Sequence, residues 1–277
     1  FSRSETSDTF AQEAVVSAQK WQMSPEGQHI ELGIAETNLF LQLSALGLSG
    51  SMFGERLLPI GTVYDPFIRR GLDAMHYGCY QDSRYMLVAT PSGITLAPEG
   101  GAHQSSETPL ITLAQPGMAA FEPAYVDELA EIMRWGFEYM QADDGGAVAL
   151  RLSTRVLDQP DREMTDDLRS SITRGGYWLK KPEQGTELVI AYCGAIAPEA
   201  IAAHEDILED IPGAGFTRWE STHSASPGTC RTSIGTTGSI PMRFSMQQHG
   251  RASGVWDSRS GTLTIRYDTI ARAFRLM

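Results

Sequence analysis

Apolar residues recur at helical spacing in three parts of the chain, each bounded by glycine or proline. The first pattern begins after Gly33 and predicts a helix that stops at Gly47 or Gly50. Its apolar positions are Ala35, Leu39, Leu43, Ala45 and Leu46. A second helix is predicted over residues 66–80, and a strong amphipathic helix is predicted with Pro123 near its first turn. One face of this last helix is formed by Val126, Leu129, Ala130, Met133, Phe137 and Met140.

Short apolar runs bounded by turn residues alternate with these helices. They lie at residues 85–90, 110–116, 147–153 and 187–196. Buried strands that alternate with helices are typical of parallel sheets. The sequence therefore predicts an α/β fold in which a mostly parallel sheet is flanked by helices and is followed by a smaller α/β C-terminal domain.

The chain is predicted to divide into two domains joined by a linker. The first domain covers residues 1–155 and opens on a polar stretch with one short helix over residues 9–21. Residues 156–186 are polar and rich in turn residues, so we interpret them as the linker, with one strand-like insert at 175–179. The second domain is expected over residues 187–277, where a strand and a helix ending near residue 208 come first.

Beyond about residue 215 the regular pattern is lost. Residues 216–277 hold eight arginines, no lysine and 18 serines or threonines, and a single run, 262–267, predicts a strand. Our hypothesis is that part of this segment is frame-altered or strongly diverged. The alternative is a basic tail that docks on an acidic partner.

Composition excludes several classes of protein. The chain has 277 residues, of which 42% are hydrophobic and 20% are charged, which is ordinary globular usage. No apolar run reaches the roughly 18–20 residues of a membrane helix, and a net charge of −12 argues against nucleic acid as a partner. Residues 1–10 lack the apolar core of a signal peptide, and the three cysteines have neither metal-binding nor disulfide spacing. We therefore expect a cytoplasmic protein with no metal ligands of its own.

Glu36 is the first candidate for chemistry. It opens the helix predicted after Gly33, in the sequence Gly-Ile-Ala-Glu-Thr. A carboxyl group that is shielded from water at this point would suit proton relay. The alternative is an acid that only interacts with the positive end of the helix dipole.

A glycine-rich loop over residues 91–107 carries the second candidate, His103. The loop follows a predicted strand, and α/β proteins bind ligands at the carboxyl ends of their parallel strands. Histidine transfers protons near neutral pH, which suits it to such a position. The alternative is an ordinary surface histidine.

The third candidate is Tyr64, at a predicted strand-to-helix junction. An exposed ring at this point would stack on a flat heterocycle, whereas the alternative is a core tyrosine. Arg69 and Arg70 follow it and could bind an anion, although solvated helix arginines are more common.

Taken in order, these motifs resemble a known family. They are Gly-Ile-Ala-Glu at 33–36, an aromatic residue before Phe-Ile-Arg-Arg at 67–70, Glu-Gly-Gly-Ala-His-Gln at 99–104, and the helical segment at 121–133. This order resembles the pyrimidine-binding domain of transketolase-like thiamine diphosphate enzymes, and it is most similar to the homodimeric pyruvate dehydrogenase E1 component. The resemblance covers roughly residues 10–155 and, less closely, residues 170–208.

The resemblance implies roles for individual residues. Glu36 would hydrogen-bond N1′ of the cofactor's aminopyrimidine and favour the tautomer whose 4′-nitrogen takes the thiazolium C2 proton. Glu36 and His103 would be the catalytic residues. The cofactor-binding residues would be Glu36, Tyr64 and Phe67, and the substrate-binding residues would be His103, Glu99 and Gln104. Gln104 matches transketolases, whereas homodimeric E1 enzymes often differ there, so the substrate class stays open.

The resemblance also implies partners. In this family a separate domain with a Gly-Asp-Gly…Asn motif holds the diphosphate and its Mg²⁺, and the chain has no such motif. We therefore expect an N-terminally truncated pyrimidine domain that is inactive without a diphosphate-binding domain or subunit, in a homodimer or a heterotetramer. The expected function is that of a component of an E1-type 2-oxo acid dehydrogenase, which passes its product to a lipoyl-bearing E2. The alternatives are ketol transfer between sugar phosphates and a noncatalytic interaction fragment.

Overall fold

The computed structural model describes residues 27–185, 188–219, 252–257 and 262–267. The chain divides into two compact units, residues 1–34 and residues 35–277. In the first unit the described residues, 27–34, form neither helix nor strand, and the helix predicted over 9–21 lies outside the described residues. Among the helices of the described ranges, none has the length and apolar character needed to cross a membrane.

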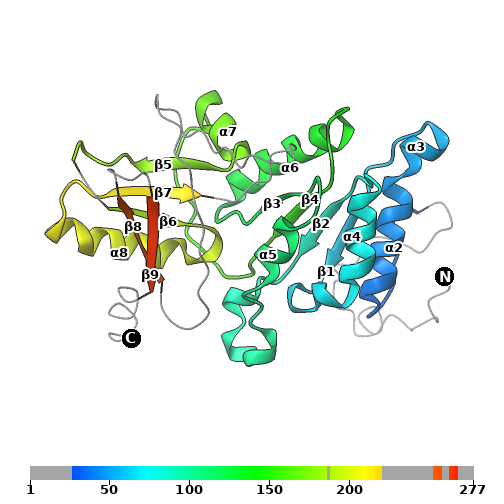
Figure 1. The fold of residues 1–277 in the computed structure, drawn as a ribbon, viewed down its shortest axis with the longest axis horizontal. Helices are drawn as coiled ribbons and strands as arrows, with labels where there is room; N and C mark the ends of the chain where they lie inside the picture. Colours follow the sequence, from blue (N-terminus) through cyan, green and yellow to red (C-terminus); the bar gives the residue numbers. More distant parts are fainter. Residues whose placement is uncertain (1–26, 186–187, 220–251, 258–261, 268–277) are drawn as a thin grey trace, which may run out of the picture. The chain divides into compact units, whose positions relative to one another are not determined.

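The main sheet contains four parallel strands in the order β1-β2-β4-β3 (Figure 1). They are β1 (Ile60–Val63), β2 (Met86–Ala89), β3 (Ala119–Phe121) and β4 (Val148–Arg151). The predicted strands at 85–90 and 147–153 are thus confirmed as β2 and β4. Because all four strands run in the same direction, their carboxyl ends meet at one edge of the sheet.

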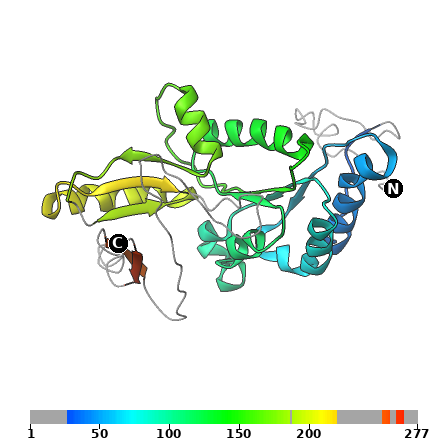
Figure 2. The same cartoon turned by 45° about the horizontal axis from the view of Figure 1, so that its top comes forward.

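Helices cover both faces of this sheet (Figures 1 and 2). On one face lie α2 (Glu36–Gly47), α4 (Leu72–Tyr80) and α5 (Thr108–Leu113), and on the other lie α6 (Val126–Gln141) and α7 (Asp166–Thr173). The alternating side chains of β2 explain why both faces are covered. Leu87 and Ala89 pack in the core beside α2, α4 and α5, whereas Met86 and Val88 pack in the core beside α6 and α7. The predicted α/β class, with a parallel sheet between helices, is confirmed.

One prediction near α5 was wrong, and one strand was missed. Residues 110–116 are not a strand, since most of them lie in α5, where Pro109 occupies the first turn and favours a helical start. The missed strand is β3, whose three residues give too short an apolar run to stand out in the sequence. An apolar run of this length has no periodicity that separates a helix from a strand.

The helices also differ in detail from the prediction. Gly50 does not end the first helix but lies inside a separate short helix, α3 (Ser49–Phe53). The helix predicted over 66–80 begins as a 3₁₀ helix, η1 (Asp65–Gly71), and continues as α4. On α6, Val126 and Ala130 are exposed rather than buried. The buried residues of α6 are Glu128, Glu131, Ile132, Gly136 and Met140.

A second sheet has the order β5-β7-β6. Its strands are β5 (Gly176–Lys180), β6 (Val189–Tyr192) and β7 (Gly215–Trp219), and α8 (Ala197–Asp210) packs against β6. The strand-like insert at 175–179 is confirmed as β5, which pairs antiparallel with β7 rather than standing alone in a linker. The linker also contains α7, which the polar composition of residues 166–173 concealed.

The C-terminal segment is described only in part. Strand β9 (Thr262–Tyr267) confirms the predicted strand. It pairs antiparallel with β8 (Ala252–Asp257), which no sequence pattern indicated. Residues 220–251, 258–261 and 268–277 lie outside the described residues, so the hypotheses of an altered frame and of a basic tail stay hypotheses.

Candidate active site

The carboxyl edge of the main sheet gathers the polar segments that leave the four strands. Tyr64 and Asp65 follow β1, and a long loop over residues 90–107 follows β2. Glu122 follows β3, and Arg151 is the last residue of β4. Open α/β sheets bind ligands outside the carboxyl ends of their strands, so this edge is the candidate active site.

Three rings meet above this edge. The hydroxyl of Tyr64 lies 2.8 Å from Nδ1 of His103, which belongs to the 3₁₀ helix η4 (Gly101–His103) of the long loop. The ring of Phe67 packs edge-on against Tyr64, with centroids 5.0 Å apart, and lies 6.3 Å from the ring of His103. All three side chains are half-buried, which leaves part of each ring open to a ligand.

Arg70 connects these rings to Glu36. Its guanidinium carbon lies 4.2 Å above the centroid of Phe67, and its Nη1 lies 3.6 Å from Oε1 of Glu36. The side chain of Glu36 is 12% exposed, whereas that of Arg70 is 53% exposed. Glu36 occupies the first turn of α2, where the helix dipole favours an acid.

A glycine allows Glu36 and Arg70 to approach each other. A Cβ atom on Gly71 would lie 2.2 Å from Cδ2 of Phe40 and 3.0 Å from the carbonyl oxygen of Glu36. The hydroxyl of Thr37 also donates to the carbonyl oxygen of Arg70 at 2.9 Å. The start of α2 is therefore held tightly against η1.

The structure brings together four of the six predicted site residues. Glu36, Tyr64, Phe67 and His103 form one continuous line through Arg70. The side chains of Glu99 and Gln104 are exposed, and neither forms a hydrogen bond or ion pair with another described residue. Glu99 ends the 3₁₀ helix η3 (Ala97–Glu99), and Gln104 directly follows His103.

A cluster of buried charges lies at the same edge, and sequence reasoning missed it. Asp65 is fully buried. Its Oδ2 accepts hydrogen bonds from the backbone N–H of Gly93 at 2.8 Å and from the hydroxyl of Ser105, and it lies 3.2 Å from Nε of Arg151. Asp65 therefore ties both ends of the loop that carries His103 to the end of β1.

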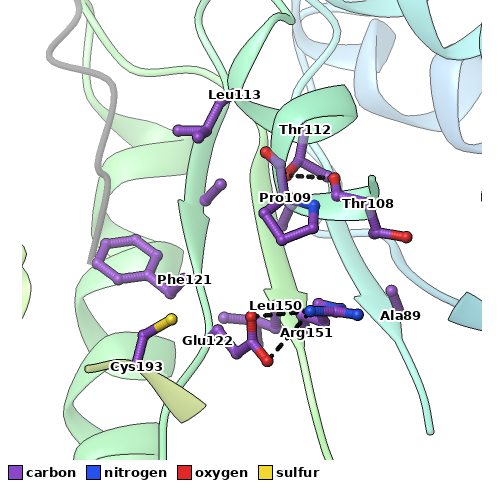
Figure 3. A pocket seen from close by; sticks show the side chains of 12 residues that line it. Ala89, Thr108, Pro109, Thr112, Leu113, Phe121, Glu122, Leu150, Arg151 and Cys193 are labelled. Carbon is purple, nitrogen blue, oxygen red and sulfur yellow. Dashed lines mark hydrogen bonds and ion pairs between the residues drawn. The ribbon is translucent and has the colours of Figure 1, made fainter. Parts of the chain in front are cut away.

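Arg151 completes this cluster. Its Nη1 lies 3.2 and 3.1 Å from the two carboxylate oxygens of Glu122, across the ends of β4 and β3 (Figure 3). Its Nη2 donates to the carbonyl oxygen of Ser105, and Ser92 donates to Glu122 at 3.3 Å. A charge inside the apolar run Ala-Val-Ala-Leu-Arg-Leu was the one sequence signal for this cluster, because arginine is almost never buried without partners.

A small cavity of about 50 Å³ lies beside the cluster, under α5 (Figure 3). Its lining includes Glu122, Arg151, Thr108 and Cys193. The remaining lining residues are Ala89, Pro109, Thr112, Leu113, Ala120, Phe121, Ala149 and Leu150. This cavity has room for only a few water molecules, so a larger ligand would bind at the half-buried rings instead.

The buried cysteine of α4 is not a candidate nucleophile. Burial raises the pKa of the Cys79 thiol to about 11, and this effect exceeds the opposing hydrogen bond to Tyr85. Cys79 lies in the core between α4 and the sheet, away from the carboxyl edge. Since the thiolate is the reactive form, this thiol is inert near neutral pH.

The fold is an α/β domain with a parallel sheet between helices. A half-buried acid, three rings and a charge cluster at the carboxyl edge are typical of a ligand-binding domain of this class. Residues 6–153 match the family model of the pyruvate dehydrogenase E1 component middle domain. This match covers more than half of the chain, which therefore belongs to that family, within the transketolase-like thiamine diphosphate enzymes. The predicted family is thus confirmed.

Curated relatives come from both branches of these enzymes. Transketolase 1 of Escherichia coli is 26% identical over 181 residues, which are 65% of this chain and 26% of the relative. The pyruvate dehydrogenase E1 component of Mycolicibacterium smegmatis is 27% identical over 194 residues, which are 68% of this chain and 21% of the relative. The chain thus spans about a quarter of the length of these relatives.

Solved structures show the same fold. Transketolase from Campylobacter jejuni superimposes with a TM-score of 0.60 and 17% identity, over 70% of this chain and 28% of that one. A split-gene transketolase, described as an inactive β4 tetramer, gives a TM-score of 0.50 and 21% identity, over 67% of this chain and 54% of that one. At these identities the likeness concerns the fold alone.

Proposed function

We propose that this chain is a component of a thiamine diphosphate-dependent 2-oxo acid dehydrogenase of the pyruvate dehydrogenase E1 type. In this proposal residues 1–155 bind the aminopyrimidine, and residues 187–277 correspond to the family's C-terminal domain. Residues 156–186 are the linker between these two domains. The observation that carries the proposal is the continuous line from Glu36 through Arg70 and Phe67 to Tyr64 and His103.

The residues present fit the cofactor's pyrimidine ring. A ring nitrogen needs a carboxyl group that is shielded from bulk water, and the side chain of Glu36 is 12% exposed at a helix start. A flat heterocycle needs aromatic surface, and Tyr64 and Phe67 present half-buried rings, the second of which is stacked on the arginine that binds Glu36. The chain would hold only this end of the cofactor, since the diphosphate and Mg²⁺ would be held by a partner domain.

The bound cofactor would supply an electron sink for the bond next to the carbonyl group of the substrate. Glu36 would hold the pyrimidine ring at N1′ and share a proton with that nitrogen. Arg70, bound to Glu36 on one side and stacked on Phe67 on the other, would fix the distance between them. His103 would hold a proton close to an oxygen of the substrate.

The arginines near the site favour a 2-oxo acid over a sugar phosphate. Arg69 pairs with Glu107 at 2.5 Å, and Arg70 pairs with Glu36. Arg84 precedes β2 and is bound to Asp82, Ala142 and Asp143 at the amino edge of the sheet, away from the site. These arginines are committed to protein partners, whereas a sugar phosphate needs free basic groups.

The main alternative is ketol transfer between sugar phosphates. Gln104 directly after His103 and the similarity to Transketolase 1 favour it. The other alternative is a noncatalytic interaction fragment. A lipoyl-bearing E2 would be the acceptor for the E1-type activity alone, and a diphosphate-binding partner, in a homodimer or heterotetramer, is common to both activities.

Reconstitution tests the proposal. The full chain would be mixed with a diphosphate-binding partner of the family, thiamine diphosphate and Mg²⁺, and turnover of pyruvate would be followed with an artificial electron acceptor. We expect Glu36→Gln to lower turnover by about 10²-fold or more, because general acid–base catalysis is worth that much. The matched control is Glu138→Gln, on the exposed side of α6, which should leave turnover unchanged.

Each alternative has its own signature in this assay. Turnover of a ketose phosphate and an aldose phosphate, without turnover of pyruvate, would replace the E1 assignment with ketol transfer. No turnover of either substrate class, despite complex formation with the partner, would favour the interaction fragment. Equal activity of Glu36→Gln and the wild type would remove Glu36 from the mechanism.

A further inference from the structure

We propose that Tyr64 is a positioning residue that fixes His103 as the tautomer with its proton on Nε2. His103 would then present an N–H donor to an oxygen of the substrate. This inference rests on the proposed function only in placing a substrate next to His103. It gives Tyr64 a task beyond the stacking contact that the sequence predicts.

The hydrogen bond between Tyr64 and His103 determines which ring nitrogen of His103 carries the proton. Neutral imidazole has one N–H donor and one acceptor nitrogen, and the 2.8 Å contact involves Nδ1. Within the described residues, the hydroxyl of Tyr64 has no other hydrogen-bond partner. If Nδ1 carried the proton, the phenol proton would have no acceptor among the described residues and would have to turn to solvent, which would break the 2.8 Å geometry. The phenol therefore donates to Nδ1, and the ring proton resides on Nε2.

Packing holds both rings in this orientation. Phe67 meets Tyr64 edge-on, with an angle of 84° between the ring planes, and the rings of Tyr64 and His103 are tilted by 52° at a centroid distance of 5.9 Å. Such edge-to-face contacts favour one relative orientation. The hydroxyl of Tyr64 is thus directed at Nδ1 by its neighbours as well as by the hydrogen bond.

The backbone of His103 is anchored to the residue that follows Tyr64. The N–H of His103 donates to Gly100 at 3.0 Å, and its carbonyl accepts from the N–H of Ser105 at 3.2 Å. The hydroxyl of Ser105 in turn donates to the buried carboxylate of Asp65. Two adjacent residues at the end of β1 therefore hold His103. Tyr64 binds the imidazole ring of His103, and Asp65 binds the loop that carries His103.

The other ring nitrogen of His103, Nε2, determines which kind of ligand atom can bind there. Nε2 of His103 has no hydrogen-bond partner among the described residues, and as an N–H it requires an acceptor. The keto and carboxylate oxygens of a 2-oxo acid are both acceptors. An approaching hydroxyl group would serve less well as an acceptor than an anionic oxygen, because bonds to charged groups are stronger.

Nitrogen NMR of the full chain tests this inference directly. Long-range ¹H–¹⁵N spectra distinguish protonated from unprotonated ring nitrogens, and they would be recorded at about pH 8.5, where ordinary imidazoles are neutral. The His103→Gln variant assigns the signals. We expect Nδ1 of His103 to show the unprotonated signature in the wild type. In Tyr64→Phe the ratio of the Nε2-protonated tautomer to the Nδ1-protonated tautomer should fall by about fivefold to tenfold, which is the net effect of one hydrogen bond.

Tyr80→Phe is the matched control, because Tyr80 is 74% exposed on α4 and should leave the His103 signals unchanged. A protonated Nδ1 in the wild type would overturn the inference without any variant, and so would an unchanged ratio in Tyr64→Phe. The measurement needs neither cofactor nor partner. A failed reconstitution with a confirmed tautomer would therefore count against the proposed function alone, and the reverse result would count against the role of Tyr64 alone.

Discussion

Tyr64 and Asp65 are neighbours in the chain, yet they belong to two regions of opposite character. Tyr64 belongs to the ligand-facing line, which consists of Glu36, Arg70, Phe67, Tyr64 and His103 and is partly open to solvent. Asp65 belongs to the buried cluster, which consists of Asp65, Arg151, Glu122, Ser92 and Ser105. Both regions lie at the carboxyl edge of the same sheet.

The two regions differ in how many partners each charge has. In the buried cluster Asp65 accepts three hydrogen bonds and Arg151 reaches two carboxylates and one carbonyl, as buried charges require. In the ligand-facing line Glu36 has one ion pair, at 3.6 Å, and His103 has one side-chain hydrogen bond. Most of the bonding capacity of the buried cluster is used within the protein, although Oδ1 of Asp65 has no hydrogen-bond partner among the described residues. The ligand-facing line keeps more of its capacity and depends on the cluster for its position.

Removing Arg151 should show the largest effect. In Arg151→Met two carboxylates would lose their cationic partner, and breaking a buried pair in this way costs about 3–5 kcal/mol. The same change in the ligand-facing line, Arg70→Met, should cost at most about 1 kcal/mol, because Arg70 is 53% exposed. Urea unfolding of both variants measures the difference, and equal losses would contradict the division into two regions.

Changing His103 should leave stability intact and affect turnover. In His103→Ala we expect turnover in the reconstituted enzyme to fall by about 10²-fold, since a positioned acid–base group is lost. Thiamine diphosphate affinity and the melting temperature should stay near the wild-type values, because His103 is half-buried and contacts the edge of the site. Isothermal titration separates the two effects. Loss of cofactor affinity would mean that the loop belongs to the cofactor site instead.

The ligand-facing line could be predicted from the sequence, because its residues stand in recognisable motifs. Glu36 follows a glycine at a helix start, and His103 lies in a glycine-rich loop after a strand. What could not be predicted is the contact between Tyr64 and His103, since it joins residues 39 positions apart through side-chain orientation. The same limit applies to the role of Arg70, whose two contacts depend on how α2 packs against η1.

The partners within the buried cluster could not be predicted from the sequence, although the arginine in an apolar run hinted at a buried charge. Asp65 and Arg151 are 86 residues apart, and each stands at the end of a strand where polar residues are common. Only the parallel order β1-β2-β4-β3 brings these strand ends to one edge. The pattern of β2 and β4 could be read because both strands are buried on both faces, whereas β3 is only three residues long and has no pattern of its own.

Gly93 contacts both regions, and its substitution should cause a loss of stability of intermediate size. A Cβ atom at this position would lie 2.1 Å from the hydroxyl oxygen of Ser105, 2.3 Å from its backbone nitrogen and 2.9 Å from the carbonyl oxygen of His103. Gly93→Ala should therefore push the two sides of the loop apart and cost about 1–3 kcal/mol. It should also shift the ring signals of His103 in the nitrogen spectra. Gly101→Ala is the control, since nothing lies within 4 Å of its Cβ position.

The smallest effect on stability is expected for an exposed ion pair beyond the end of β4. This effect should depend on pH. Arg155 lies 2.6 Å from Glu199 of α8, and both side chains are more than a third exposed. The hydrogen bonds from Arg155 lower the pKa of Glu199 below its usual value of 4.5. A carboxyl group with a lowered pKa in the folded state stabilises the protein above the unfolded pKa and loses this contribution as the pH falls through the folded value.

Glu199→Gln should thus reduce the free energy of unfolding by at most about 1 kcal/mol at pH 7. The difference from the wild type should shrink below about pH 4.5, where the unfolded carboxyl group takes up its proton first, and should vanish at lower pH. Urea unfolding of both proteins at several pH values between 3 and 7 would follow this trend. A difference that stayed constant with pH would assign the loss to packing of the side chain on α8. High salt should also reduce the difference, whereas the loss caused by Arg151→Met should persist, because solvent ions screen exposed pairs far more than buried ones.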